Sequence, residues 1–188
     1  MSVKFKVVNV VATAALDRSV DLELLAKDFR KEVLFDSDIY GGRVAYFKSK
    51  DMTGKVSIFW SGKMIGVGTR TINGAKRELE LVAKVLRSNL KTKPSIRNIV
   101  AIVDFGVELD LNSIASSRIA SSRKFRIIYE PEQFPGVIVH VLFPHGKKAV
   151  FLIFGSGKVV CTGPQSILDL EDAVRTLSAD IVEIGETR

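Results

Sequence analysis

The chain has few of the residues that most often carry chemistry. Its 188 residues include one cysteine and two histidines. A lone cysteine, Cys161, cannot form an internal disulfide, which favours a reducing setting inside a cell. So few thiols and imidazoles argue against a zinc site of the usual ligand types. No Ser-His-Asp arrangement or paired-carboxylate set stands out, so we expect no catalysis, no metal and no cofactor.

Long apolar runs are also missing. No run approaches the 18 or so residues that a membrane span needs. The opening stretch "MSVKFKVVNVVATAAL" sets lysines before apolar residues, as a signal peptide does, but Asn9 interrupts it and its β-branched residues alternate. This pattern favours a strand over a cleaved leader. With 46% hydrophobic and 26% charged residues, the composition is typical of one folded domain or two small ones.

Negative charge is scarce in one half of the chain. The formal net charge is +7, which permits a polyanionic partner. Residues 1–94 carry 18 Lys+Arg against 10 Asp+Glu, whereas residues 95–188 carry 10 against 11. The positive charge therefore belongs to the first half. Charge alone leaves open whether it binds a polyanion or is an ordinary basic surface.

The sequence repeats itself. "IFWSGKMIGVG" (Ile58–Gly68) returns as "IFGSGKVVCTG" (Ile153–Gly163), at an offset of 95. "VVNVVATAALDRSVDLELLA" (Val7–Ala26) aligns with "IRNIVAIVDFGVELDLNSIA" (Ile96–Ala115) at an offset of 89. Two long copies are too few for a solenoid, so we expect two similar halves that form one pseudo-symmetric unit. The predicted halves are residues 1–94 and 95–188.

Each half predicts the order β-α-β-β-β-β-α. A β-rich run (Lys4–Ala14; Arg97–Phe105) precedes a short helix (Leu22–Phe29; Leu111–Ala120), then apolar β-branched runs separated by turn signals, then an amphipathic helix. Strands joined by tight turns indicate an antiparallel sheet and an α+β fold. Helices gathered on one face would leave the other face open.

The repeated "SGK" invites comparison with a phosphate-binding loop. That loop needs a glycine five residues before the Gly-Lys glycine and Ser or Thr after the lysine. The second copy has Leu152 and Val159 at these positions, and the first copy has Ser57 and Met64. The nucleotide-binding interpretation therefore fails in both copies.

A more specific resemblance joins three stretches of the second half. "YEPEQFPG" (Tyr129–Gly136), "LIFGSGKVVCTG" (Leu152–Gly163) and "IRNIVA" (Ile96–Ala101) resemble the second direct repeat of the TATA-box-binding protein family. "VVNVVAT" and "IFWSGKM" resemble the first repeat. The resemblance runs from about Val3 to Ile184, follows the archaeal pattern of a conserved core alone, and is looser in the first half.

The resemblance implies a saddle with a ten-stranded curved antiparallel sheet. Its concave face would lie on the DNA minor groove and its helices on the convex face, since this family is known to kink DNA with apolar wedges. The minor groove offers few distinguishing donors and acceptors, which an apolar sheet face would suit.

The family pattern assigns roles to residues that match it. The wedges correspond to Tyr40, Phe59, Phe134 and Phe154. Base-edge and groove-floor contacts correspond to Asn9, Val11, Ile65, Val67, Asn98, Val100, Leu152, Val160 and Thr162. Phosphate contacts correspond to Lys63 and Lys158, and the loop that meets transcription factor B corresponds to Glu130, Glu132 and Gln133. Core packing is the alternative for the phenylalanines, and an ordinary solvated loop is the alternative for the acidic residues.

The first half departs from the family pattern. Tyr40 replaces a wedge phenylalanine, Val67 replaces a base-contacting threonine, and Ser57 replaces an apolar groove residue. Tyr46 and His140 stand six residues after the first wedge of each half, where arginines usually reach phosphates. We therefore expect the second half to keep DNA wedging and factor docking, and the first half to be tuned toward another sequence, weaker bending or another partner.

The resemblance implies a general transcription initiation factor. It would bind double-stranded promoter DNA, bend it, and recruit transcription factor B and, indirectly, RNA polymerase. A divergent paralogue that acts as a regulatory protein-interaction module with weak DNA binding is one alternative. A repair or nuclease enzyme is another, although such enzymes usually join one copy to a catalytic domain. An uncovered apolar sheet face would also favour self-association off DNA.

Overall fold

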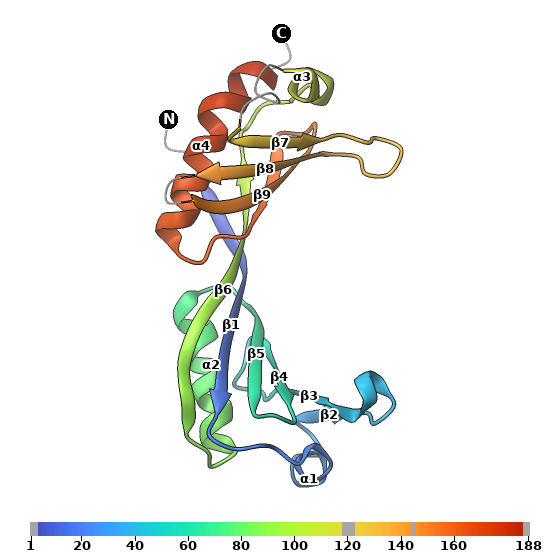
Figure 1. The fold of residues 1–188 in the computed structure, drawn as a ribbon, viewed down its shortest axis with the longest axis vertical. Coiled ribbons are helices and arrows are strands. Elements are labelled where there is room, and N and C mark those ends of the chain that lie inside the picture. Colours follow the sequence, from blue (N-terminus) through green and yellow to red (C-terminus); the bar gives the residue numbers. More distant parts are fainter. Residues whose placement is uncertain (1–3, 118–122, 144–145, 186–188) are drawn as a thin grey trace. The chain divides into compact units, whose positions relative to one another are not determined.

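The computed structural model describes residues 4–117, 123–143 and 146–185. Its elements follow the order β-α-β-β-β-β-α twice, as the sequence predicts, with one added 3-10 helix, η1 (Figure 1). The first copy consists of β1 (Phe5–Leu16), α1 (Leu22–Asp28), β2 (Val33–Phe35), η1 (Ile39–Gly42), β3 (Val44–Phe47), β4 (Lys55–Phe59), β5 (Lys63–Thr69) and α2 (Ile72–Val85). The second consists of β6 (Leu90–Asp104), α3 (Leu111–Ser116), β7 (Phe125–Ile128), β8 (Val137–Phe143), β9 (Lys147–Ile153), β10 (Lys158–Thr162) and α4 (Ile167–Gly185).

The ten strands form one sheet in the order β2-β3-β4-β5-β1-β6-β10-β9-β8-β7. Within each copy the pairings are antiparallel, so the predicted α+β fold with a ten-stranded antiparallel sheet is confirmed. The residues group into two compact units, Asn9–Arg97 and Met1–Val8 with Asn98–Arg188. We call them the first-repeat unit and the second-repeat unit.

Two element boundaries differ from the prediction by more than two residues. The strand expected to begin at Arg97 begins at Leu90 in β6. Sequence analysis missed these first residues because they include two lysines and a proline, which are not typical of a strand. A proline is tolerated where its missing N–H is not needed for pairing. The helix expected over Leu111–Ala120 ends at Ser116, since Ser117 is extended, and residues 118–120 lie outside the described part.

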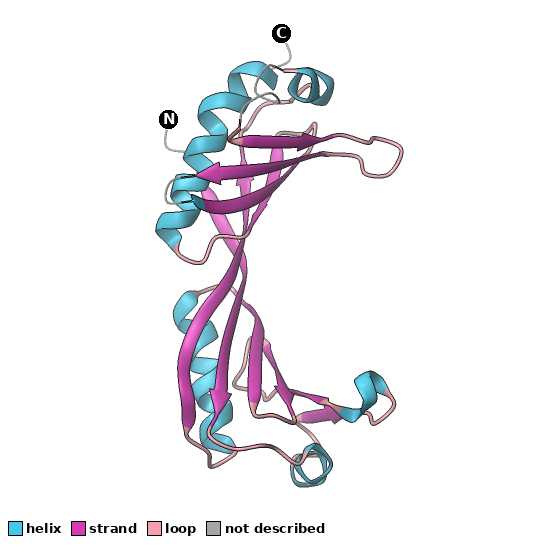
Figure 2. Ribbon diagram, viewed as in Figure 1, coloured by secondary structure: helices cyan, strands magenta, loops and turns pink. Residues whose placement is uncertain are grey.

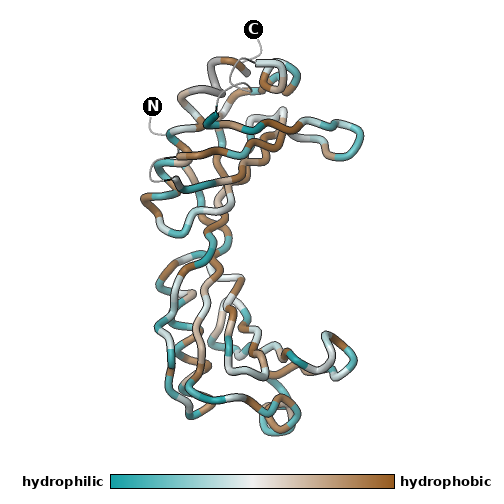
Figure 3. The backbone as a smooth tube through the Cα atoms, in the orientation of Figure 1, coloured by the Kyte–Doolittle hydropathy of each residue, from teal (hydrophilic) through white to brown (hydrophobic). Residues whose placement is uncertain are grey.

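The strands of each unit bury one face and leave the other uncovered. In β1, Val10, Ala12 and Ala14 are buried while the residues between them are only half-buried. α2 packs against β4 and β5 in the first-repeat unit, and α4 packs against β8 and β9 in the second (Figure 2). Apolar residues run along the strands, and the β7–β8 hairpin tip is hydrophilic (Figure 3). We call the helix-free side of each unit its open face.

The long helices begin at similar caps. Thr71 precedes α2 and its Oγ1 accepts a hydrogen bond from the N–H of Gly74 at 3.0 Å, while Ser166 precedes α4 and its Oγ accepts from the N–H of Asp169 at 3.1 Å. Such caps satisfy N–H groups that the first helical turn leaves without partners. No helix among the described residues is long and apolar enough to cross a membrane.

Candidate DNA-binding face

Strand register gives the two open faces matching rows of residues, which include three of the predicted groove-floor residues, Ile65, Leu152 and Val160. Cross-strand pairing in the first-repeat unit gives the row Leu34–Tyr46–Ser57–Ile65–Thr13. The equivalent row in the second-repeat unit is Ile128–Ile138–Leu152–Val160–Ile102. The rows correspond because Ser57 and Leu152 each stand two residues before the repeated phenylalanine. The second row is entirely aliphatic, whereas the first carries three hydroxyl groups.

The two predicted wedges of the second-repeat unit contact each other. The rings of Phe134 and Phe154 meet edge to face with centroids 5.7 Å apart, and both are half-buried. A Cβ atom at Gly136 would lie 2.9 Å from the Phe134 ring and 2.8 Å from the carbonyl oxygen of Ile153. Glycine therefore makes room for the ring pair, which the sequence "FPG" alone does not reveal.

The first-repeat unit has no ring pair at the equivalent place among its described residues, and its edge-to-face pair joins Phe29 to the buried Phe47 instead. Leu34 pairs with Tyr46, which leaves eleven residues between them, whereas Ile128 pairs with Ile138 around nine. The first loop is thus two residues longer. Counting forward from β2 makes Tyr40 the equivalent of Phe134. Counting backward from β3 makes Gly42 the equivalent of Phe134 instead.

The extra residues change the environment of both first-repeat aromatics. Tyr40, Gly41 and Gly42 have φ values of 51°, 60° and 66°, a left-handed conformation that costs a non-glycine residue roughly 1–2 kcal/mol. Tyr40 is 73% exposed. Phe59 pairs instead with Val44, which register places at the position equivalent to Gly136. A buried valine side chain therefore stands where the second unit keeps space for a ring.

The register also corrects one sequence-based alignment. Tyr46 was expected to be the counterpart of His140, but it pairs with Ser57, whereas His140 pairs with Val150. The residue equivalent to His140 is Lys48, whose N–H bonds to the Glu32 carbonyl oxygen at the edge of the sheet. The first-repeat unit therefore has a cation at this position, which the two inserted residues hide in a simple alignment.

The two predicted base-reading asparagines are held in the same way. Oδ1 of Asn9 accepts a hydrogen bond from the N–H of Gly68 at 2.8 Å, and Oδ1 of Asn98 accepts from the N–H of Gly163 at 2.7 Å. An amide N–H can only donate, so each side-chain oxygen faces the backbone and fixes the flip of the amide. The NH₂ groups are then available as donors.

Only the second-repeat unit adds a hydroxyl to this arrangement. Nδ2 of Asn98 lies 2.9 Å from Oγ1 of Thr162 as a donor, and the Thr162 hydroxyl also lies 3.2 Å from Oδ1 of Asn98. In the first-repeat unit Val67 occupies the equivalent position, so Asn9 has no such partner. The second asparagine is therefore better fixed on its open face.

The remaining predicted residues lie on the open faces or at their margins. Val11, Ile65, Val67, Val100, Leu152 and Val160 are half-buried. Lys63 and Lys158 are exposed and begin β5 and β10. Glu130, Glu132 and Gln133 are exposed on the β7–β8 loop, where the N–H groups of Gln133 and Phe134 both bond to the Glu130 carbonyl oxygen. That loop is therefore a closed turn that presents acidic side chains.

Sequence reasoning missed two polar contacts in the first-repeat unit. Arg97 donates from Nε to Oγ1 of Thr13 at 3.0 Å, and the Lys55 ammonium lies 5.0 Å from the centre of the Tyr46 ring. Alternation along β1 could have placed Thr13 on the open face, because Asn9 and Val11 precede it at two-residue steps. Nothing in the sequence brings Arg97 to it.

The described residues offer little for other chemistry. They contain no group of three or more His, Cys, Asp or Glu side chains that could hold a metal ion. Cys161 is fully buried in β10, and this burial raises the pKa of its thiol to about 12. Nucleophilic chemistry needs the thiolate, so this cysteine is an inert core residue.

The chain is similar to known proteins along nearly its whole length. The family model described as "Transcription factor TFIID (or TATA-binding protein, TBP)" matches residues 4–89 and again residues 93–184. TATA-box-binding proteins of Cenarchaeum symbiosum and Methanothermobacter thermautotrophicus are 36% and 35% identical to it. These alignments cover 94% and 97% of this chain and 91% and 97% of the relatives.

A solved structure agrees with the sequence relatives. Methanococcus jannaschii TBP matches with a TM-score of 0.75 at 30% identity, over 96% of this chain and 99% of that one. The double match of the family model and the archaeal origin of these relatives confirm the resemblance and the tandem repeat expected from the sequence.

Proposed function

Because the chain belongs to the TATA-box-binding protein family, whose members are DNA-binding factors and not enzymes, we propose that it is a general transcription initiation factor. It binds a TATA-type promoter element through the minor groove, bends the DNA, and recruits transcription factor B and then RNA polymerase. The observation that carries this proposal is the pair of helix-free open faces, each of which has half-buried apolar residues, an exposed lysine at its margin and an oriented asparagine amide.

The aliphatic row of the second-repeat unit suits the floor of a minor groove at A·T pairs. These pairs present only the acceptors adenine N3 and thymine O2 there, without the guanine amino group that G·C pairs add, so the apolar face leaves no donor unsatisfied. The Asn9 and Asn98 NH₂ groups can donate to adenine N3 or thymine O2, because their oxygens are already bonded to backbone N–H groups. The Phe134–Phe154 pair can insert at a base step, which costs a few kcal/mol of unstacking and is offset by the surface that a bend brings into contact.

A titration on two duplexes tests this proposal. One duplex carries a TATA-type element and the other is a G·C-rich control, and fluorophores on both ends report bending by energy transfer. We expect tighter binding and a higher transfer efficiency on the TATA-type duplex. Equal affinity for both duplexes with no change in transfer would instead support the regulatory paralogue with weak DNA binding.

The acidic β7–β8 loop is the proposed docking site for transcription factor B. Glu130→Arg reverses a charge on this closed turn and should weaken recruitment of factor B to the DNA complex at unchanged DNA affinity. Asp38→Arg is the matched control, since it reverses a charge on the corresponding loop of the first-repeat unit. An equal loss with both variants, or with neither, would remove the docking assignment.

A further inference from the structure

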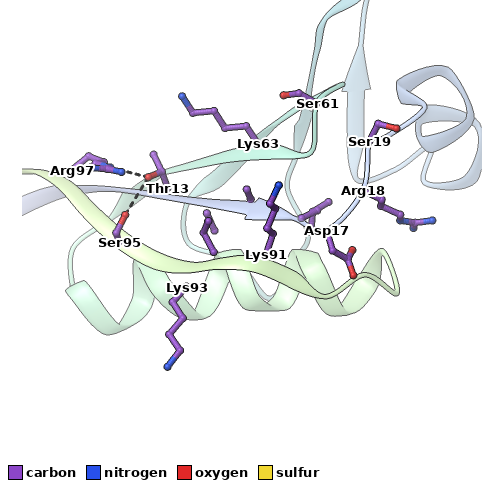
Figure 4. A pocket seen from close by; sticks show the side chains of 14 residues that line it. Thr13, Asp17, Arg18, Ser19, Ser61, Lys63, Lys91, Lys93, Ser95 and Arg97 are labelled. Carbon is purple, nitrogen blue, oxygen red and sulfur yellow. Dashed lines mark hydrogen bonds between the residues drawn. The ribbon is translucent and has the colours of Figure 1, made fainter.

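A polar pocket lies in the first-repeat unit, where the end of β1 runs between β5 and the start of β6 (Figure 4). Five cationic residues and five residues with side-chain hydroxyls line it. The cationic residues are Arg18, Lys63, Lys91, Lys93 and Arg97, and the hydroxyl residues are Thr13, Ser19, Ser61, Thr92 and Ser95. Only Lys63 was expected to contact a ligand, so most of the pocket has no assigned role.

Hydrogen bonds fix two sides of the pocket. Oγ1 of Thr13 accepts from Nε of Arg97 at 3.0 Å and lies 3.4 Å from Oγ of Ser95 (Figure 4). This contact uses one of the five N–H donors of Arg97, so its terminal amino groups stay available. Arg18 is held differently, because its guanidinium donates to the Leu86 carbonyl oxygen at 2.7 Å and to Ser88. Arg18 therefore supports the wall, whereas Arg97 can bind a ligand.

The positive charge of the pocket is not balanced within it. Among the described residues, Lys63, Lys91 and Arg97 form no ion pair with a carboxylate. Asp17 is the one acidic residue in the lining, and it accepts a hydrogen bond from Asn89 at 3.2 Å. Lys63 and Lys91 extend to the same side of the sheet, whereas Lys93 extends to the other side (Figure 4). The pocket is thus suited to an anion that approaches from the side of Lys63 and Lys91.

The same place in the second-repeat unit is not suited to an anion. Lys158 is the counterpart of Lys63, but it pairs across the strands with Asp104, whereas Lys63 pairs with Ala15. Ile102 occupies the position of Thr13. A carboxylate beside the lysine offsets its charge and repels a phosphate, so the two lysines are not equivalent.

We propose that this pocket is a binding site for a backbone phosphate of duplex DNA next to the bound element, held by Lys63, Lys91 and Arg97. The inference rests on the proposed function, because it takes DNA to lie on the open face. Lys63 follows Phe59 through a tight turn, in which the Gly62 N–H bonds to the Phe59 carbonyl oxygen at 2.9 Å. The pocket therefore lies beside a predicted wedge, where a kinked backbone would pass.

Salt dependence of DNA affinity measures this site. Lys91→Ala and Arg97→Ala should each weaken binding and make the slope of log affinity against log salt shallower by about one unit, the effect of one lost phosphate contact. Lys93→Ala is the matched control. Lys93 also borders the pocket, but its side chain extends to the other side of the sheet (Figure 4), so removal of its charge should leave the slope near the wild-type value. Unchanged slopes for Lys91→Ala and Arg97→Ala would overturn the site.

A duplex with single uncharged methylphosphonate linkages locates the phosphate. Wild-type protein should lose affinity at one flanking position, and Arg97→Ala should show no further loss there while it still responds to substitutions elsewhere. Ala15→Asp copies the second-repeat unit and should reproduce the loss, and Asp104→Ala should steepen the salt slope. If Arg97→Ala loses as much affinity as the wild-type protein at every methylphosphonate position, the site does not exist.

These outcomes separate the pocket from the general function. If the wild-type protein neither prefers nor bends a TATA-type duplex, the proposed function fails. If it prefers and bends that duplex while Lys91→Ala matches Lys93→Ala in salt slope, only the phosphate pocket fails. Thermal unfolding of Arg97→Ala checks that loss of the Thr13 contact has not unfolded the unit. Lys91→Ala repeats the test without this risk, because the Lys91 side chain makes no hydrogen bond among the described residues.

Discussion

The two repeat units share a fold but present different surfaces to a ligand. The central row of the second-repeat unit is aliphatic throughout, whereas that of the first carries the hydroxyls of Thr13, Tyr46 and Ser57. The second unit has two aromatic rings in edge-to-face contact at its margin, whereas the first has Val44 beside Phe59 at that place. The first unit instead has the pocket with Lys63, Lys91 and Arg97, which form no ion pair with a carboxylate among the described residues. The comparison indicates apolar insertion in one unit and electrostatic attraction in the other.

The largest difference that we expect between single variants concerns the two asparagines. Asn98→Ala removes a donor and leaves the Gly163 N–H without its acceptor, which should cost about 2–3 kcal/mol and weaken DNA binding roughly 30–100-fold. Asn9→Ala should cost less, roughly tenfold, because no threonine orients Asn9. Gel-shift titration measures both.

A control separates the two parts of this effect. Asn98→Asp keeps an oxygen for the Gly163 N–H but replaces the donor NH₂ with a negatively charged oxygen. This variant should fold normally and still lose DNA affinity. Equal losses for Asn9→Ala and Asn98→Ala would contradict the difference between the units.

The tip loop of the first-repeat unit offers a gain-of-function test. Replacing residues 36–44 by residues 130–136 removes the two extra residues, restores a phenylalanine before β3, and replaces Val44 with glycine. We expect a ring pair with Phe59, a larger bend and an affinity increase on the order of tenfold, because a second inserted wedge lets the bent DNA contact more protein surface. A graft that folds but leaves bending unchanged would show that the loop is not what separates the units.

Exchange of one hydroxyl gives a smaller effect. Thr162→Val should weaken binding several-fold, because the loss of one hydrogen bond costs about 1 kcal/mol. Val67→Thr should strengthen binding by a similar factor by giving Asn9 the partner that Asn98 has. Affinity changes in the same direction for both variants would argue against matching roles for the two positions.

A pH-dependent difference in stability is the smallest expected effect. Burial raises the pKa of Asp169, but hydrogen bonds from Lys147 and Ser166 and the Lys147 charge outweigh it and hold the pKa below its ordinary value of 3.8. Because the folded-state pKa is the lower one, the contact stabilises the fold above about pH 4 and is lost as pH falls through the folded value.

The first-repeat unit has Gly74 at the equivalent place, so it has no such acid sensitivity. Asp169→Asn should lower the free energy of unfolding at pH 7 by on the order of 1 kcal/mol, and by less near pH 3. Denaturant titration at the two pH values checks this. An equal loss at both would mean that the carboxylate charge does not matter.

Much of the fold could be predicted from the sequence because two copies of one pattern constrain each other. The turn signals and β-branched runs gave the element order, and the echo of Phe59 in Phe154 aligned the strands that follow. Sequence analysis missed the two-residue insertion beside Tyr40, because the loop can be aligned with the second repeat from either of its ends and the sequence does not favour one alignment. Only cross-strand pairing shows that Lys48 matches His140, and only side-chain contacts reveal Arg97 at Thr13.

The two units are expected to wedge the DNA unequally. Energy transfer between end-labelled fluorophores on a TATA-type duplex, with each variant at saturating concentration, measures the bend directly. We predict that Phe154→Ala abolishes most of the bend while the protein stays folded, and that Phe59→Ala reduces it by a clearly smaller amount. Equal reductions by the two variants, or an unchanged bend with Phe154→Ala, would contradict the account.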